Sequence, residues 1–422
     1  MRRGASTPPA VLAGAVALVG VVAGLGGAAA TLLLHLVEHV AYGFSFPDFL
    51  EAVQAAPPGV RFGALTAAGL LGATGWWALR RFGRPVVVVE QAVAGARMPA
   101  VSTTSTVLLQ LTVVGLGASI GRELAPRLLG ALGADRIADA LGITPQTRRL
   151  LVACGAGAGL AAVYDVPLGG AVFALEVLLL EIRPAGAIAA IATSGIATIV
   201  ARVVVPAVPL YAVTTTTTPA PGWLVWTAIV GPLLGLAGVG FDALARRARR
   251  LRPRPGLQLV VMPVVFAAIG ALAIVEPLVL GNGRALAQSA FGPTVPLGAL
   301  LLLAACKALA TSATVFSGAD GGTLTPSVSI GAALGAAAGI PVLHLVPGLT
   351  AADCAVVGAA AFLAATMQAP LTATVLLVGF TAASPALLLP IVLAVAAATA
   401  TGHLVRRGRG GRADHETGVD GG

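Results

Sequence analysis

Long apolar runs, separated by short arginine-rich segments, dominate this chain. Runs near the ~20 residues that an α-helix needs to cross a bilayer recur along its length. They lie at residues 10–35, 60–79, 185–204, 221–243, 257–280 and 386–404. Shorter apolar runs between them are interrupted by Gly and Pro, which predicts helices that cross only part of the membrane. The pattern predicts an all-α polytopic membrane protein.

One hexapeptide among the apolar runs has a copy in the other half of the chain. Gly121-Arg122-Glu123-Leu124-Ala125-Pro126 keeps its Gly, Leu and Pro in Gly321-Gly322-Thr323-Leu324-Thr325-Pro326, 200 positions later. A second pair, Pro167-Leu168 and Pro370-Leu371, is separated by 203 positions. A duplicated unit of roughly 200 residues explains both offsets and is typical of transporters and channels whose site lies between repeats. We therefore expect two inverted-topology repeats with broken, re-entrant helices.

Glu123 is the candidate functional residue. A carboxylate at membrane depth costs at least a few kcal/mol and marks a functional site by default. Each hexapeptide precedes an apolar run, so each predicts a helix N-terminus inside the bilayer, where free N–H groups and the helix dipole attract anions. The segment Gly95-Ala96-Arg97-Met98-Pro99 predicts another helix start with further anion contacts. An ordinary capped loop fits that spacing equally well.

Composition and charge support the membrane prediction. Hydrophobic residues make up 57% and charged residues 10% of the 422 residues, against roughly 25% charged residues in soluble domains. The net charge of +9 would suit nucleic acid, but the basic residues lie in short loops that the positive-inside rule explains better. Those segments are Arg2-Arg3, Arg80 to Arg84, Arg136 to Arg149, Arg246 to Arg254 and Arg406 to Arg412. They predict a multi-pass protein of the cell (inner) membrane with both termini in the cytoplasm.

A different class of function is suggested by His35-Leu36-Val37-Glu38-His39, which fits the H-x-x-E-H pattern of inverted zinc metallopeptidases. Two histidines at the end of a membrane helix, next to Tyr42, also suit the headgroup zone, and no obvious third ligand follows. We expect no metal site and no enzyme.

Several motifs resemble those of the chloride channel/antiporter (CLC) family. Gly121-Arg122-Glu123 with Pro126 resembles the GREGP motif, Gly321 to Pro326 resembles its GxFxP partner, and Gly95 to Pro99 is similar to GSGIP. Asp165 to Glu176 resembles the NAPLAGxxFxxE helix, and Gly281 to Arg284 and Ala369 to Thr372 also have counterparts. The motifs occur in the family's order over roughly residues 10–405. No sizeable cytoplasmic regulatory domain is expected.

The resemblance implies a homodimer in which each subunit has its own pore for chloride, lined by helix N-termini. Glu123 would be the gating glutamate, occupying an anion site when ionised and leaving it when protonated or displaced by chloride. The implied anion-binding set is Gly95, Ala96, Gly121, Arg122, Glu123, Leu124, Thr323 and Leu324. Bound chloride ions, but no cofactor, are expected, with protons as possible co-substrates.

The sequence also departs from the family pattern. Leu124-Ala125 replaces a single glycine, Ala96 replaces a serine that contacts the central ion, and no tyrosine follows Tyr211 to serve that ion. Val177 replaces the inner proton acceptor, for which Glu181 is a possible substitute on the proton path. Channel and proton-coupled antiporter therefore both remain open, as do transport of fluoride or a small organic anion and the peptidase alternative.

Two further expectations concern Lys307 and the division of the chain. Lys307 lies in an apolar run, where its charge either attracts chloride to the pore or snorkels to the surface. The expected segments are a cytoplasmic N-terminus (1–9), a first repeat (10–205), a linker (206–220), a second repeat (221–405) and a disordered cytoplasmic tail (406–422).

Overall fold

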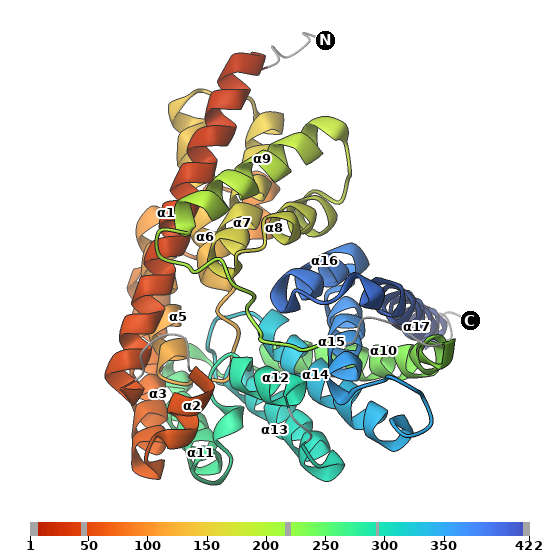
Figure 1. Ribbon diagram of the computed structural model, residues 1–422. Coiled ribbons are helices and arrows are strands. Elements are labelled where there is room, and N and C mark those ends of the chain that lie inside the picture. The colour runs from red at the N-terminus through yellow and green to blue at the C-terminus, as the bar shows by residue number, and fades with distance from the viewer. Residues whose placement is uncertain (1–6, 44–48, 216–220, 293–294, 417–422) are drawn as a thin grey trace, which may run out of the picture.

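The computed structural model describes residues 7–43, 49–215, 221–292 and 295–416, which fold into helices without any strand (Figure 1). The first half contains α1 (Pro9–Tyr42), α2 (Phe49–Ala55), α3 (Pro58–Phe82), α4 (Val89–Val93), α5 (Ala100–Gly115), α6 (Leu124–Ala140), α7 (Pro145–Tyr164), α8 (Pro167–Phe173), η1 (Ala174–Leu179) and α9 (Pro184–Ala201). The second contains α10 (Pro221–Arg250), α11 (Pro255–Val275), η2 (Pro277–Val279), α12 (Arg284–Phe291), α13 (Leu297–Phe316), α14 (Leu324–Gly339), η3 (Ile340–Val342), α15 (Ala351–Met367), α16 (Pro370–Thr381), η4 (Pro385–Leu387) and α17 (Leu388–Glu416).

Proline sets the start of many of these helices. Pro9, Pro58, Pro145, Pro184 and Pro255 each occupy one of the first two positions of a helix. Proline has no N–H to leave unpaired there, and its fixed φ suits the first turn. The Pro-rich breaks in the apolar pattern are therefore helix starts.

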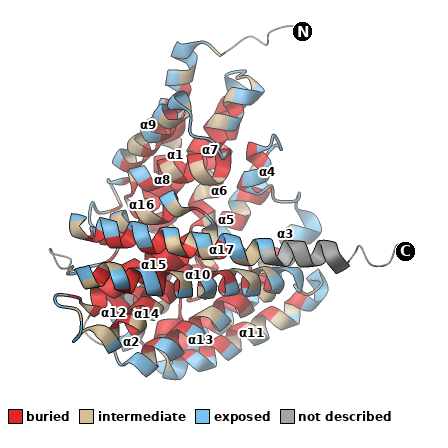
Figure 2. Ribbon diagram, turned by 90° about the vertical axis from the view of Figure 1, so that its right-hand side faces the viewer, coloured by how far each residue is buried: buried red, intermediate tan, exposed pale blue. Residues whose placement is uncertain are grey.

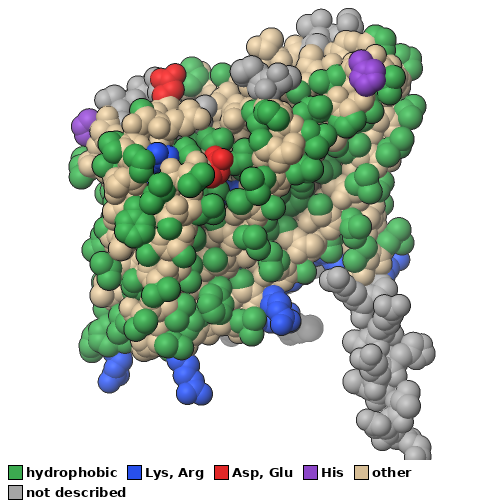
Figure 3. All heavy atoms as spheres, turned by 90° about the horizontal axis from the view of Figure 1, so that it is seen from below, with side chains coloured by type: hydrophobic (Ala, Val, Ile, Leu, Met, Phe, Trp, Pro, Cys, Tyr) green, Lys and Arg blue, Asp and Glu red, His purple; other side chains and the backbone are tan. Residues whose placement is uncertain are grey.

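Eight helices of the described chain are long and apolar enough to cross a membrane. They include the six runs expected from the sequence, together with α13 and the segment Leu324–Val342. Four shorter apolar helices, α5, α8 with η1, α15 and α16, fit partial crossings. Figure 3 shows a broad apolar face, with basic side chains projecting mainly from one rim and histidine and acidic side chains on the opposite rim. The protein is therefore a multi-pass membrane protein.

The backbone repeats as the sequence does. Among the described residues, four non-glycine positions have positive φ, and they form two equivalent pairs: Asp165 with Gln368, and Leu180 with Ala382. Gly117 and Gly318, with φ of 105° and 106°, make a third pair before the two hexapeptides. Strained conformations that recur at the repeat offset support a duplicated unit.

Small residues let the central helices approach closely. A side chain at Gly155 on α7 would overlap the Gly130 carbonyl of α6, and one at Gly358 on α15 would overlap Gly335 of α14. All four glycines are buried, and Figure 2 shows buried residues along their helices. Without a hydrophobic force between helices in lipid, such close backbone packing is a main source of association.

The end of the chain differs from the prediction. Helix α17 continues through Glu416, whereas the expected tail begins at residue 406; the division of the chain stays a prediction. Residues 417–422 lie outside the described chain, as do 1–6 of the expected N-terminus and 216–220 of the linker.

Candidate functional site

The two hexapeptides lie side by side at the centre of the molecule. The Gly121 N–H donates to the Gly322 carbonyl at 2.8 Å, and the Gly322 N–H donates to the Gly121 carbonyl at 3.1 Å, forming an antiparallel bridge. The buried Gln110 amide also donates to the Gly121 carbonyl at 2.9 Å. Antiparallel pairing of equivalent residues is the geometry that a two-fold axis between the repeats produces.

The Glu123 carboxylate binds the second hexapeptide. Its Oε1 accepts the Leu324 N–H at 2.7 Å, and its Oε2 accepts the Thr325 hydroxyl at 3.1 Å. The side chain is 1% exposed. Leu324 begins α14, so the carboxylate lies at a helix N-terminus, where unpaired N–H groups and the dipole favour negative charge. A free anion would meet the same donors.

Glycine makes room for this carboxylate. A Cβ atom on either Gly121 or Gly322 would overlap the oxygens of Glu123. The two glycines kept in the repeat are therefore required by the buried side chain between them.

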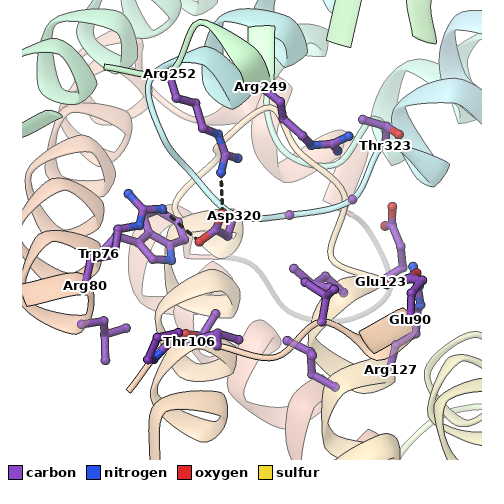
Figure 4. Close-up of a pocket in the computed structure, with 18 of the residues that line it drawn as sticks. Trp76, Arg80, Glu90, Thr106, Glu123, Arg127, Arg249, Arg252, Asp320 and Thr323 are labelled. Carbon is purple, nitrogen blue, oxygen red and sulfur yellow. Dashed lines mark hydrogen bonds and ion pairs between the residues drawn. The ribbon is translucent and has the colours of Figure 1, made fainter. Parts of the chain in front are cut away.

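A large cavity opens on one side of Glu123 (Figure 4). Its volume is about 750 Å³, and Glu123, Leu124, Thr323 and Leu324 line its inner end. Asp320 accepts from Arg80 at 3.0 Å and from Arg252 at 2.9 Å. In Figure 4 Arg249 extends toward Thr323.

Arginines outnumber carboxylates in this cavity. Five arginines line it, Arg80, Arg84, Arg127, Arg249 and Arg252, with Glu90, Glu123 and Asp320 as the acidic residues. Arg127 pairs with Glu90 at 3.1 Å. The excess of positive charge focuses a field that concentrates anions near the entrance.

The structure brings together six of the eight predicted anion-binding residues: Gly121, Arg122, Glu123, Leu124, Thr323 and Leu324. Glu123, Leu124, Thr323 and Leu324 line the large cavity, Gly121 pairs with Gly322, and Arg122 lines a separate small cavity. Gly95 and Ala96 are exposed and line neither cavity. The structure thus places that turn apart from both cavities, and its anion contact stays a prediction.

The Gly95 to Pro99 turn is held by side chains of α6 and α7 that line neither cavity. The Met98 N–H donates to Asp135 at 3.1 Å, and Arg148 donates to the Ala96 carbonyl at 2.9 Å. Asp135 lies three turns along α6 from Leu124, or about 16 Å along the helix axis at 1.5 Å per residue, so the turn is held against a different part of α6 from the end that Glu123 precedes.

Two features of the site escaped the sequence analysis. The segment that faces Glu123 across the large cavity comes from residues 83–88, just after α3. Nothing in its composition distinguishes it from a basic loop, because only the fold turns it inward. Thr325 was visible within the repeat, but its role depends on the direction of its hydroxyl.

The predicted proton path is not continuous with this cavity. Glu181 is half-exposed and pairs with Arg183 at 3.1 Å, and neither residue lines the cavity. Glu176 accepts from the Leu371 N–H at 3.0 Å and from the Thr372 N–H at 2.6 Å, so it caps α16.

Lys307 does not reach the surface. It is fully buried, and its Nζ donates to the carbonyls of Val279 at 2.9 Å and Gly281 at 2.6 Å. These bonds hold the loop before α12, so the snorkelling alternative is wrong.

The histidines of the peptidase pattern lie apart from the large cavity. His35 is half-buried beside the small cavity, and His39 is exposed. In the chain that the structure describes, no group of three or more His, Cys, Asp or Glu side chains is placed to hold a metal ion.

The helical fold and the buried carboxylate between duplicated helix starts define a multi-pass membrane transport protein. The chain belongs to the voltage gated chloride channel family, whose model matches residues 68–403. It is 33% identical over 330 residues to a ClcB-like chloride channel protein of Ralstonia nicotianae, covering 75% of this chain and 74% of that protein. It is 34% identical over 308 residues to the voltage-gated ClC-type chloride channel ClcB of Escherichia coli, covering 68% and 70%.

Solved structures share the fold. A slow cyanobacterial Cl⁻/H⁺ antiporter superposes with a TM-score of 0.82 at 21% identity, covering 95% of this chain and 96% of that one. A CLC-type fluoride/proton antiporter gives 0.69 at 18% identity, covering 93% and 96%. The expected family and fold class are therefore confirmed.

Proposed function

We propose that this protein carries chloride across the membrane along a path that Glu123 gates. One observation carries the proposal: the buried Glu123 carboxylate occupies the N-terminus of α14 and accepts from Leu324 and Thr325. Those neutral donors bind a small anion as readily as a carboxylate. Movement of the side chain away from them exposes an anion site next to the large cavity.

The placement of the neighbouring residues Arg122 and Glu123 supports a gate at this position. Glu123 lines the large cavity, whereas Arg122 lines the small one. The bridge between Gly121 and Gly322 and the bonds of Glu123 to Leu324 and Thr325 join the two hexapeptides at this point. Protonation removes the charge that these donors stabilise, so acid releases the side chain and opens the path.

We further propose that chloride movement is not tightly coupled to protons. Val177 carries no proton at the position that the family resemblance assigns to the inner acceptor, and its neighbour Glu176 is engaged in capping α16. The ion pair of Glu181 with Arg183 also disfavours Glu181 as a relay.

Chloride flux from reconstituted liposomes tests both statements when external pH is followed in the same vesicles. Chloride efflux without proton movement is expected. Uphill proton movement driven by a chloride gradient would instead establish antiport and direct attention to Glu181. Absence of chloride flux in protein that is folded would refute the transport proposal itself.

The membrane orientation and assembly are also proposals. The basic rim suits the cytoplasmic side of a cell membrane, which places α1's first residues and the end of α17 there. Exposed apolar residues on α9 and η4–α17, such as Ile188, Ile199 and Leu389, suit a homodimer interface in the bilayer. Cysteine cross-linking at position 199 should capture a dimer, whereas Ile274, exposed on α11, provides the control position.

A further inference from the structure

A second, small cavity is separate from the large one that Glu123 lines. Its volume is about 40 Å³, and it is lined by side chains of both halves, including Arg122, Tyr164 and Arg284. The loop at residues 205–210 forms its rim. A cavity already holds one water molecule when ~10–15 Å³ is open to the centre of that molecule, so this one has room for a small inorganic anion.

Arg122 is buried but incompletely paired. Its side chain is 6% exposed, and its guanidinium carbon lies 4.9 Å from the centre of the Tyr164 ring. Within the described chain its Nε has no hydrogen-bond partner. A buried donor of a charged group that lacks an acceptor is costly, and an anion in the adjacent cavity would supply that acceptor.

Arg284 brings a second guanidinium from the other repeat. It is the first residue of α12, and its N–H donates to the Asn282 side chain at 3.1 Å. Arg122 and Arg284 are close enough to influence each other electrostatically. Two like charges held together in a buried setting favour an anion between them.

The loop that carries Arg284 is firmly anchored. Lys307 donates to two of its carbonyls, including that of Gly281. The Gly281 N–H in turn donates to the Gly117 carbonyl at 2.8 Å, which ties the loop to the turn before the first hexapeptide. The segments that carry the two guanidinium groups are thus joined by a backbone hydrogen bond.

Basic side chains outnumber acidic ones in the lining of the small cavity, where Arg122 and Arg284 face Asp165 as the acidic residue. Glu38, 8% exposed on α1, interacts electrostatically with both arginines, and its ionised form offsets one of them. Asp165 is already paired with Arg202 at 2.9 Å. His35 also lines the cavity and interacts electrostatically with both arginines, but an imidazole adds no negative charge.

We propose that Arg122 and Arg284 form an outer binding site for one monovalent inorganic anion, one step from the donors that Glu123 occupies. The site rests on the proposed function, because it would load the pathway that Glu123 closes. It is separate from the Glu123 position, since side-chain guanidinium groups rather than helix N–H groups bind the ion.

Calorimetric titration of sodium chloride into chloride-free purified protein tests the site directly. Arg284→Gln should weaken chloride binding about tenfold, equivalent to ~1.4 kcal/mol, because one of the two guanidinium groups is lost. Arg284→Lys should retain part of the affinity, since it keeps the charge but not the planar fork. Glu38→Gln should tighten binding, because it removes the carboxylate that offsets the pair.

Arg284→Gln and Glu38→Gln should change chloride affinity in opposite directions. Misfolding would instead weaken chloride binding in both variants, so the two causes are distinguishable. Arg183→Gln removes an exposed arginine that lines neither cavity and should bind chloride like the wild type. Unchanged binding in Arg284→Gln, or weaker binding in a folded Glu38→Gln variant, would overturn the outer site. Because calorimetry needs no transport, failed flux with intact Arg284-dependent binding would reject only the proposed function.

Discussion

Replacing Glu123 by glutamine isolates the charge of the gate from its shape. The amide has nearly the same size as the carboxyl group, but it carries no charge and does not titrate. In the wild type, Oε1 and Oε2 accept from Leu324 and Thr325 at 2.7 and 3.1 Å. The variant keeps one oxygen for the Leu324 N–H and presents an NH₂ group to the Thr325 hydroxyl.

The size of the effect follows from these two bonds. Hydrogen bonds to charged groups contribute about 1.5–3 kcal/mol, against about 0.5–1.5 kcal/mol for neutral pairs. Loss of the charge therefore weakens the closed position by about 2–3 kcal/mol, since two bonds are affected. At 1.4 kcal/mol per factor of ten, the open state becomes about 30- to 150-fold more populated.

The assay is chloride efflux from liposomes as a function of pH. Wild-type flux should rise as pH falls, because protonation removes the same charge. Glu123→Gln should show the higher flux at every pH. Glu90→Gln provides a matched control, since Glu90 lines the same cavity but pairs with Arg127 outside the gate, and its acid activation should persist.

Two results would refute this reasoning. Persistent acid activation in Glu123→Gln would mean that another group gates the path. Loss of acid activation in Glu90→Gln would mean that charge in the large cavity, rather than the bonds of Glu123, controls flux.

Other predictions concern the surroundings of the gate. Thr325→Val removes one of the two bonds to the charged carboxylate, so flux at neutral pH should rise about 10- to 150-fold while acid activation persists; unchanged flux would argue against that bond. In Gly322→Ala the added methyl group would overlap the Glu123 carboxylate, so this variant should give high flux with weak pH dependence. Gly298 has open space around it, so Gly298→Ala should behave like the wild type in the same assay. Lys307→Met leaves two buried carbonyls without their donor and should lower the free energy of unfolding by about 2–4 kcal/mol. Thermal unfolding in detergent measures this change, and unchanged stability would contradict the anchoring role.

Much of this protein could be predicted from its sequence because the membrane imposes strong constraints. In lipid every backbone group must be satisfied within the protein, and runs of ~20 apolar residues do so as helices, so apolar runs and proline breaks determined the helical class and most helix starts. The duplicated hexapeptide led to Glu123 because a carboxylate inside apolar runs is costly unless it has a function. The equivalent hexapeptide in the second half of the chain led to Thr323 and Leu324.

Tertiary structure decided what local patterns leave open. Gly95 and Ala96 matched a helix-start pattern, yet Asp135 and Arg148 hold that turn away from both cavities. A helix cap has the same sequence signature wherever it lies in the fold, so spacing alone does not identify the turn that faces the cavity.

The sequence by itself determined the membrane class and the repeat, and it singled out Glu123 as the candidate carboxylate, because these depend on composition and on local backbone requirements. Only the tertiary structure decided that residues 83–88 face Glu123, that Lys307 anchors a loop, and that Arg122 and Arg284 share a cavity. Each of these depends on contacts between segments far apart in the chain, whose relative placement is set by packing of whole helices rather than by any local pattern.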